Sequence, residues 1–515
     1  MPTLHLSSYI SNLHESIKAK DAKSLAPSFA LYPPNRNPNA TWHGPLLLAF
    51  LDRPDRGQNR QDRALMPEGT PYVPSYAAQF ARTLKKEWAD MATNHVWALV
   101  ALYPPVDVAS GTYYVAPDPV RAYKKQHEVA TSLYKYLIDS KDVNTGWALD
   151  LLYRVCQDLR RVAEEADQTL MARGEKPGKL EEASRLLQKC FACCVNDRSQ
   201  SADVESTRKM GTYYLASLLF KTYFKLNSTA LCKNIIRGIT SQSVPELDVF
   251  PNGHRITYMY YLGVFAFLRE DYADAEQKFV FALEGIHKKA TRNIDLILDY
   301  LIPIMLLRGV VPSDKLLRRP SSSHRALYGP FVDAIRTGNV KAYDRQLDRA
   351  EKRLMERGTY LVVERAREVC VRGLLKKAWI LESKPSRIHI DTFRRYYNAA
   401  LRVEEAPTST STSTSNGKQN GRRPDGDEVF DSEEMECLLA NCINKGVIKG
   451  YISHDHQMVV LSKERPFPWY PPYRRLSPAD QKAREEREIA ERKREVVLPP
   501  GQTTQPTANG TGSQA

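Results

Sequence analysis

Apolar side chains follow a helical spacing over most of this 515-residue chain. From about residue 5 to residue 400 they recur three and four positions apart, a period typical of amphipathic helices. The first such segment carries Leu6, Ile10, Leu13 and Ile17. Strand-like alternation is nearly absent before residue 447. A chain with this pattern is largely restricted to packed helices, so the sequence predicts an all-α architecture.

A repeat-like segment between residues 260 and 283 narrows the architecture further. Tetratricopeptide-type repeats use small residues where two antiparallel helices approach closely, and large ones to fill the space between them. One such pair cannot bury its own apolar face, so neighbouring helices must stack on it. The expected neighbours are 206–226, 229–240, 294–308 and 325–337. The small positions are Gly263, Ala275 and Ala282, and the large ones are Tyr261, Tyr272 and Phe279.

Near residue 371 the helical repeats give way to a different pattern, in which helices are followed by strand-like runs. Two helices are expected, VRGLLKKAWILE and IDTFRRYYNAAL, and a third should begin with Asp431 or Ser432 as its cap and end at Gly446. Strand-like runs follow at 447–452 and 458–462, joined by the polar turn SHDHQ. Three helices and a β-hairpin form the winged-helix order. Apolar residues at helical spacing in the third helix are Met435, Leu438, Leu439, Cys442 and Ile443.

These patterns predict a tetratricopeptide-like helical solenoid that ends in a winged helix with a small β-hairpin wing. We expect a helical N-terminal region at 1–200, with a flexible loop at 52–75, and helical repeats at 201–370. The winged helix should cover 371–468, interrupted by the low-complexity insertion 407–428, which cannot form a packed core. The tail 469–515 is proline-rich, charged and expected to be largely disordered, with one solvated helix at 478–497.

The chain carries no recognisable signal for membranes or secretion. A spanning helix needs about 20 consecutive apolar residues, and the longest apolar runs are much shorter. The first residues lack a signal-peptide pattern. Eight cysteines are sparse for a disulfide scaffold and suit a reducing compartment. We therefore expect a cytosolic or nuclear protein without membrane contact.

Two small clusters could suggest a metal. Cys190, Cys193 and Cys194 lack a second ligand pair at zinc-site spacing, and Leu186, Leu187, Cys190 and Cys194 share one helical face. We interpret these cysteines as buried apolar residues. His454 and His456 begin a pattern similar to the metalloprotease motif of deneddylating isopeptidases, but its Ser and Asp positions hold Glu464 and Phe467. A polar hairpin turn with two exposed histidines is the favoured interpretation.

The sequence also lacks the common catalytic motifs. The chain has no nucleotide-binding glycine loop and no His-Glu-x-x-His pair. No paired carboxylates or nucleophile elbow stand out. We therefore predict a protein that is not an enzyme and needs no cofactor or metal.

The net charge of +14 is concentrated in two segments. Residues 314–395 hold 20 Lys or Arg against 10 Asp or Glu, and residues 444–475 hold six against two. Phosphate contacts with interleaved aromatic residues would suit nucleic acid, while a solvated face or a site for an acidic protein are the alternatives. Tyr451 is interpreted as core rather than as a stacking platform. The interleaved aromatic residues are Tyr451, Phe467, Trp469, Tyr470 and Tyr473.

The segment EEMECLLANCINKGVIKGYISHDHQMVVLSKERPFP (433–468) resembles the C-terminal winged helix of PCI-domain proteins. It is most similar to the subgroup that holds the mRNA-export (TREX-type) PCI subunit and the signalosome-associated twelfth subunit. LLQKCFACCVNDR, YLASLLFKTYFKLN and RITYMYYLGVFAF also resemble this subgroup. The resemblance covers about residues 120 to 468, and more weakly 4–28, and does not choose between the two kinds of member.

The resemblance implies a non-catalytic scaffold that pairs through winged-helix edges. Its implied partners are a large PCI-containing export scaffold subunit, a small acidic Sem/Dss-type protein, and RNA or DNA. Carried onto this sequence, the nucleic-acid contacts would be Lys445, Lys449 and Lys463, followed by Arg465. The partner interface would include Tyr451, Val459 and Val460.

Three functional hypotheses follow. The first is a subunit of a nuclear mRNA-export complex coupled to transcription, binding nucleic acid jointly with a PCI partner. The second is a scaffold associated with signalosome subunits, whose basic surface mainly contacts protein. For either role we expect the protein in the nucleus, and also allow a cytoplasmic location. The third, a stand-alone transcription factor, is disfavoured because the helix at 432–445 has an acidic start and few base-contacting groups.

Overall fold

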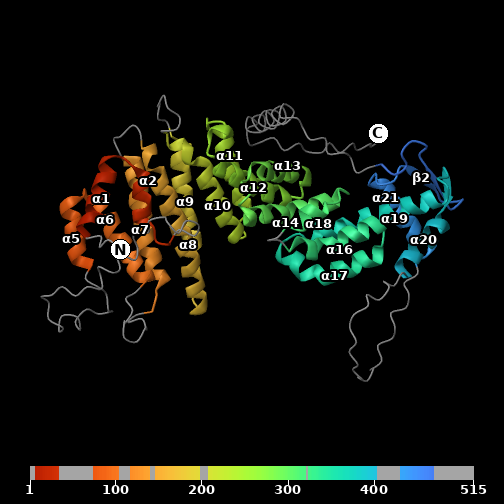
Figure 1. Ribbon diagram of the computed structural model, residues 1–515, viewed down its shortest axis with the longest axis horizontal. Helices are drawn as coiled ribbons and strands as arrows, with labels where there is room; N and C mark the ends of the chain where they lie inside the picture. Colours follow the sequence, from red (N-terminus) through yellow and green to blue (C-terminus); the bar gives the residue numbers. More distant parts are fainter. Residues whose placement is uncertain are drawn as a thin grey trace, which may run out of the picture. The chain divides into compact units, whose positions relative to one another are not determined.

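The computed structural model describes residues 6–33, 73–103, 116–139, 145–197, 207–319, 323–402 and 430–468. It divides into two compact units, one up to Ile304 and one from Met305, with the boundary inside helix α14 (Figure 1). The four-part division predicted from the sequence is not tested by this result and stays a prediction. The insertion 407–428, the tail from 469 and most of the loop 52–75 lie outside the described residues.

Every described element of the first unit is helical, as the apolar spacing predicted. Helices α6 to α10 pack successively on one another, and α12 packs on both α10 and α13 (Figure 1). Residues 173–178 separate α8 from α9. The helices are α1 (Leu6–Lys18), α2 (Ala22–Leu25), α5 (Val73–Thr83), α6 (Lys86–Leu102), α7 (Pro119–Asp139), α8 (Leu149–Ala172), α9 (Lys179–Val195), α10 (Thr212–Lys225), α11 (Ala230–Ser241), α12 (Asn252–Leu268), α13 (Tyr272–Gly285) and α14 (Thr291–Leu307).

The central helix α8 holds the N-terminal segment in place. Asp158 accepts a hydrogen bond from the Leu31 backbone N–H at 2.9 Å and pairs with Arg154 at 2.9 Å. Arg154 also donates to the carbonyl oxygen of Tyr32 at 2.5 Å. The Asp158 carboxyl is almost completely buried, and burial raises its pKa to about 6. The N-terminal segment is therefore anchored through a buried ion pair.

The cysteine cluster lies on the buried face of α9. Leu186, Leu187, Cys190 and Cys194 are all buried, which confirms the predicted apolar face. Cys193 is half-buried beside the Arg208 guanidinium, with an Nη1 to Sγ distance of 3.5 Å. Burial raises the pKa of the Cys194 thiol well above its ordinary value. These side chains fill the contact between α9 and its neighbours.

Helices α12 and α13 form the predicted repeat pair. A Cβ atom placed on Gly263 would lie 2.8 Å from Cε1 of Phe279, so only glycine fits this contact. Ala275 and Ala282 are fully buried at the other close positions. The Phe279 ring stacks on Tyr300 of α14, with ring centroids 5.5 Å apart. The three small positions, together with Phe279 and Tyr272, thus have the expected roles, since the Tyr272 ring packs on Phe267 of α12 with centroids 5.5 Å apart. The Tyr261 ring instead packs on Phe224 of α10, with centroids 5.8 Å apart, and α14 covers the pair.

The second unit combines a helical layer with a winged helix. Gly338 ends α16 at φ +74°, where a Cβ would come within 3.2 Å of the Leu374 backbone. Arg367 and Asp344 join α19 to α17 by two bonds of 2.6 and 2.8 Å. Its elements are α15 (Asp314–Leu317), α16 (His324–Thr337), α17 (Val340–Glu356), α18 (Tyr360–Arg365), α19 (Arg367–Leu381), β1 (Arg387–His389), α20 (Ile390–Arg402), α21 (Ser432–Asn444), β2 (Gly450–Ser453) and β3 (Met458–Leu461).

The winged helix contains one strand more than the sequence predicted. Strand β1 pairs antiparallel with β3, and β3 pairs antiparallel with β2, so the sheet order is β1-β3-β2. The predicted β-hairpin is confirmed as β2 and β3, whereas β1 was not predicted. Strand β1 has only three residues, of which Ile388 alone is buried, so it is too short to show an alternating pattern. Its strand conformation depends on pairing with β3.

No described helix is both long enough and apolar enough to cross a membrane.

Candidate nucleic-acid interface

Local sequence signals set where α21 begins and ends. Asp431 is its N-cap and forms a capping box with Glu434, with bonds of 2.7 and 3.0 Å. Gly446 follows its C-terminus at φ +69°, which confirms the predicted stop. The helix buries Met435, Leu439 and Cys442, whereas Leu438 and Ile443 are half-buried. The helix start, stop and apolar face all follow the predicted pattern.

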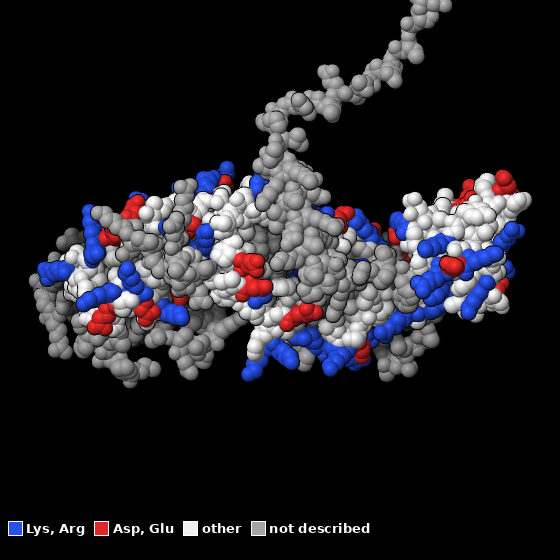
Figure 2. Space-filling model, turned by 90° about the horizontal axis from the view of Figure 1, so that it is seen from above, with Lys and Arg blue, Asp and Glu red and all other residues white. Residues whose placement is uncertain are grey.

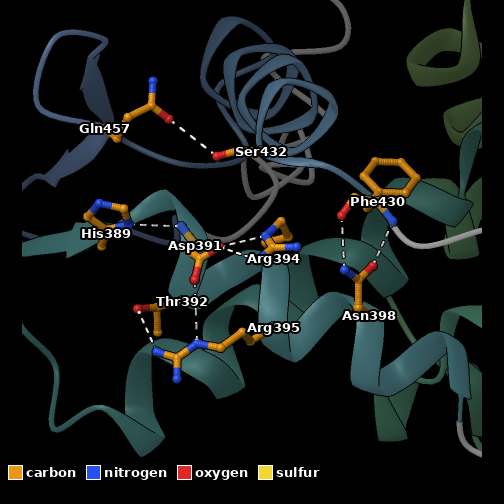
Figure 3. A network of polar contacts seen from close by, with 9 residues as sticks. All are labelled: His389, Asp391, Thr392, Arg394, Arg395, Asn398, Phe430, Ser432 and Gln457. Atoms are coloured by element: carbon orange, nitrogen blue, oxygen red, sulfur yellow. Dashed lines mark hydrogen bonds and ion pairs between the residues drawn. The ribbon is translucent and has the colours of Figure 1, made fainter.

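Polar contacts connect α20, α21 and the hairpin (Figure 3). The Asn398 side chain accepts a hydrogen bond from the Phe430 N–H and donates one to the Phe430 carbonyl, both at 3.0 Å. Ser432 donates to the Gln457 side chain at 3.3 Å, so α21 is tied to the hairpin turn. Asp391 pairs with Arg394 on α20. Helices α20 and α21 and the hairpin turn are thereby linked by polar contacts.

The hairpin turn presents two exposed histidines, as predicted. His454 and His456 both lie on the surface of the turn between β2 and β3. His454 Nδ1 lies 2.8 Å from Oε1 of Glu436 on α21. Hydrogen bonding and charge from Glu436 raise the pKa of His454 above its ordinary value. Within the described ranges, no cluster of His, Cys, Asp and Glu has an arrangement that could hold a metal ion.

The four cations proposed for nucleic-acid contact fall into two groups. Lys445 caps α21 and forms an ion pair with Glu368 of α19. The side chains of Lys449, Lys463 and Arg465 are exposed and make no hydrogen bond or ion pair with other described residues. Exposed ion pairs such as Lys445–Glu368 contribute only about 0–1 kcal/mol. Lys445 is therefore partly neutralised by its neighbour, while the other three have no charged partner among the described residues.

Backbone hydrogen bonds bring Lys449, Lys463 and Arg465 to one end of the sheet. The Lys449 N–H donates to the Pro466 carbonyl at 2.7 Å, and its carbonyl accepts from Ser462 at 2.9 Å. Arg465 has a left-handed backbone, φ 48°, at the bend before Pro466 and Phe467, which are buried. The three cations are adjacent in space although two belong to one segment and the third to another.

The residues proposed for a partner interface occupy three different environments. Val459 is completely buried inside the unit. Val460 is half-buried on the opposite face of the sheet, and the Tyr451 side chain is 61% exposed. The interpretation of Tyr451 as a core residue was wrong, because Tyr451 lies on the face of the sheet opposite to the buried residues Ile388 and Val459. The interface role of the three residues stays a prediction.

Arg387 is a further cation of the wing that no sequence pattern indicated. It lies on β1 directly opposite Val460 of β3, is exposed, and has no polar partner in the described part of the chain. No sequence signal marked it, because β1 itself was not predicted. Phe467 proved to be buried against Trp379, with ring centroids 5.5 Å apart, and Trp469, Tyr470 and Tyr473 lie outside the described residues.

Lys and Arg side chains also cover other parts of the second unit. Figure 2 shows them close together on the face it displays, with few Asp or Glu among them. Several of these positive charges form ion pairs with carboxylates of the same unit. Arg367 pairs with Asp344, and Arg394 and Arg395 share Asp391. The excess of ten positive charges between residues 314 and 395 is therefore spread over the unit, and the wing holds the cluster of unpaired cations described above.

Comparison with known families supports this description of the fold. The PCI domain family matches residues 428–463, which begin just before α21 and end after β3. Helical layers that end in a winged helix of this kind place the chain among PCI-domain proteins.

Similar proteins cover most of the chain. The Protein CSN12 homolog of Mycosarcoma maydis is 34% identical in an alignment 418 positions long that covers 75% of this chain and 85% of that protein. The Protein CSN12 homolog of Schizosaccharomyces pombe is 32% identical, covering 75% and 84%. PCI domain-containing protein 2 of Xenopus laevis is 34% identical, covering 68% and 80%. The chain belongs to the family formed by these CSN12 homologues and PCI domain-containing protein 2.

Proposed function

We propose that this chain is a non-catalytic scaffold subunit of a nuclear mRNA-export complex coupled to transcription, and that it binds nucleic acid jointly with a PCI partner. The observation that carries the nucleic-acid part is the cluster of Lys449, Lys463 and Arg465 at one end of the wing sheet, all exposed and without a polar partner among the described residues. Membership of a family of PCI-domain proteins supports the scaffold part.

The electrostatic argument concerns three like charges held close together. Each raises the positive potential at the other two, and no carboxylate side chain among the described residues pairs with them. A polyanion that neutralises them releases condensed counterions, which favours binding at low salt. An acidic protein could use the same charges, but a phosphate backbone supplies evenly spaced anions without needing a matched surface.

The proposed partners are a large PCI-containing export scaffold subunit and a small acidic Sem/Dss-type protein. The second candidate function is a scaffold associated with signalosome subunits, in which the basic wing mainly contacts protein. The observation that favours it is the group of fungal relatives named CSN12 homologues. For both candidates we propose a nuclear protein that can also be present in the cytoplasm.

Charge reversal tests nucleic-acid binding. The variant K449E/K463E/R465E should bind labelled RNA more weakly in the presence of its copurifying partners. The slope of log affinity against log salt should fall by about three, because about one unit is lost for each phosphate contact. The matched control is K189E/K233E/R237E, which makes the same charge change at exposed residues of α9 and α11. Equal RNA affinity for the wing variant and the control would contradict the proposal.

Affinity purification of the tagged chain from its own cells distinguishes the two complexes. Recovery of a large PCI-containing export scaffold supports the first candidate. Recovery of signalosome subunits without that scaffold supports the second.

A further inference from the structure

The register of the sheet places an aromatic and a basic residue in one row across its outer face. Tyr451 of β2 lies opposite Val460 of β3, and Val460 lies opposite Arg387 of β1. Directly paired residues project to the same side of a sheet. In the next row Ile388 and Val459 are 5% and 0% exposed, so that row faces the core. The row containing Tyr451 therefore faces outward.

The outer face is basic and aromatic. Ser453 lies two residues after Tyr451 and shares its side of the strand, and the exposed Lys449 directly precedes β2. Met458 and His389 form the other outward row with Ser453. None of these positions holds Asp or Glu. Tyr451 and Arg387 are exposed and make no side-chain contact with another described residue through hydrogen bonds, ion pairs or ring stacking.

We propose that the outer face of the β1-β3-β2 sheet binds single-stranded nucleic acid, with an unpaired base stacked on Tyr451 and flanking phosphates contacted by Lys449 and Arg387. This inference rests on the nucleic-acid binding proposed above. It adds that the ligand is single-stranded and that Tyr451 contacts an unpaired base. Arg387 is about 10 Å from Tyr451, two strand spacings away. An extended arginine side chain can span much of this distance.

The chemistry of the face favours unpaired bases over a duplex. In a duplex the base faces are stacked on one another, so an aromatic ring on a flat sheet has no base to contact. In a single strand every base has a free face, and stacking on an aromatic ring is independent of sequence. An apolar protein partner would leave Lys449 and Arg387 beside Tyr451 without counter-charges. A single strand would stack a base on the exposed ring and neutralise the two cations with its phosphates.

The test compares Y451A, Y451F and K449E/K463E/R465E in the full chain, purified with its copurifying partners. Binding is measured by fluorescence anisotropy with a labelled 12-nucleotide oligouridylate and with a labelled duplex RNA of the same length. Y451A should weaken oligouridylate binding about 5- to 150-fold, the factor expected for one stacked base. Duplex binding and the salt slope should be unchanged, because tyrosine is uncharged. Y451F, which keeps the ring, should bind like the wild type.

The outcomes separate this inference from the proposed function. If K449E/K463E/R465E weakens binding but Y451A does not, stacking on Tyr451 is wrong, and nucleic-acid binding by the wing cations is still supported. If Y451A weakens oligouridylate and duplex binding equally, a single-strand site is also wrong. If Y451A releases a copurifying protein without changing RNA affinity, the face is a protein interface instead. If none of the proteins binds RNA, both proposals fail. Thermal unfolding of each variant excludes loss of fold as the cause.

Discussion

Gly263 on α12 faces the ring of Phe279 on α13 so closely that a methyl group on Gly263 would lie 2.8 Å from Cε1 and 3.0 Å from Cδ1. The fully buried ring is itself stacked on Tyr300, so it cannot move away without losing that contact. This contact sets how closely the two helices of the repeat approach one another.

Gly263→Ala should therefore destabilise the first unit despite the better helix propensity of alanine. Overpacking of this kind typically costs about 1–3 kcal/mol. Gly253→Ala is the control, because it lies on the same helix with nothing within 4 Å of the added atom. Urea unfolding measures both. Phe279→Leu should offset part of the loss in a double variant, and strict additivity of the two substitutions would show that they do not share one contact.

Val459 and Val460 are chain neighbours with opposite environments. Val459 is completely buried, so Val459→Asp should cost at least about 3 kcal/mol and unfold the winged helix, because it places an unpaired charge in the core. Val460→Asp lies on the outer face and should leave the unfolding midpoint within about 1 kcal/mol of the wild type. Near-UV circular dichroism and urea unfolding check both. A folded Val459→Asp variant would contradict the assigned face of β3.

Arg372 of α19 forms hydrogen bonds with the segment that follows the wing, Phe467 and Pro468. It donates to the carbonyl oxygens of Phe467 at 2.9 Å and Pro468 at 2.5 Å. Arg372→Met keeps the length of the side chain but leaves both acceptors without this donor, at a cost of about 1–3 kcal/mol. Hydrogen exchange at the amide of Phe467 should accelerate. Arg402→Met serves as the control, since Arg402 is exposed and unpaired within the described residues. Equal stability and equal hydrogen exchange of the two variants would show that Arg372 does not hold this segment in place.

His95 and Asp158 should give the first unit opposing dependences on pH. Burial lowers the pKa of His95 to about 3, and neither ring nitrogen has a hydrogen-bond partner in the described structure. Below its ordinary pKa of 6.5 the unfolded chain takes up a proton that the folded chain does not. The free energy of unfolding should therefore fall as pH falls from 6.5 toward 3, by about 1.4 kcal/mol per pH unit.

Asp158 acts in the opposite direction. Burial raises its pKa from 3.8 to about 6, so between these values the folded chain binds the proton more tightly than the unfolded chain. Its contribution to stability rises as pH falls through this window. His95→Met should thus make the protein less sensitive to acid between pH 6 and 4, and Asp158→Asn more sensitive. Urea midpoints at pH 7, 6, 5 and 4 measure both. Parallel curves for wild type and His95→Met would be inconsistent with a neutral buried histidine.

Much of the helical structure could be predicted because its signals are local. The cap at Asp431, the stop at Gly446 and the apolar face of α9 each depend on residues within a few turns of one another. Helix breaks at prolines and glycines are local for the same reason. The repeat pair α12–α13 was predictable too, because its close contact requires small residues at fixed positions.

The candidate site was less predictable because strand faces are decided by pairing. Tyr451 and Ile452 are both apolar enough to face the core, and so are Val459 and Val460. The alternation of a strand sorts such residues into two sets but does not say which set is buried. Pairing of β3 with both β1 and β2 makes Val459 the inner residue and leaves Tyr451 exposed.

The sequence by itself determined that this chain is helical, where its repeat pair and winged helix lie, and which segments carry the excess positive charge. Only the tertiary structure decided which cations are unpaired. Lys445 meets Glu368, 77 positions away, while Lys449, Lys463 and Arg465 meet no carboxylate among the described residues. Helix formation depends on neighbours along the chain, whereas neutralisation of a charge depends on distances in space that the fold alone creates.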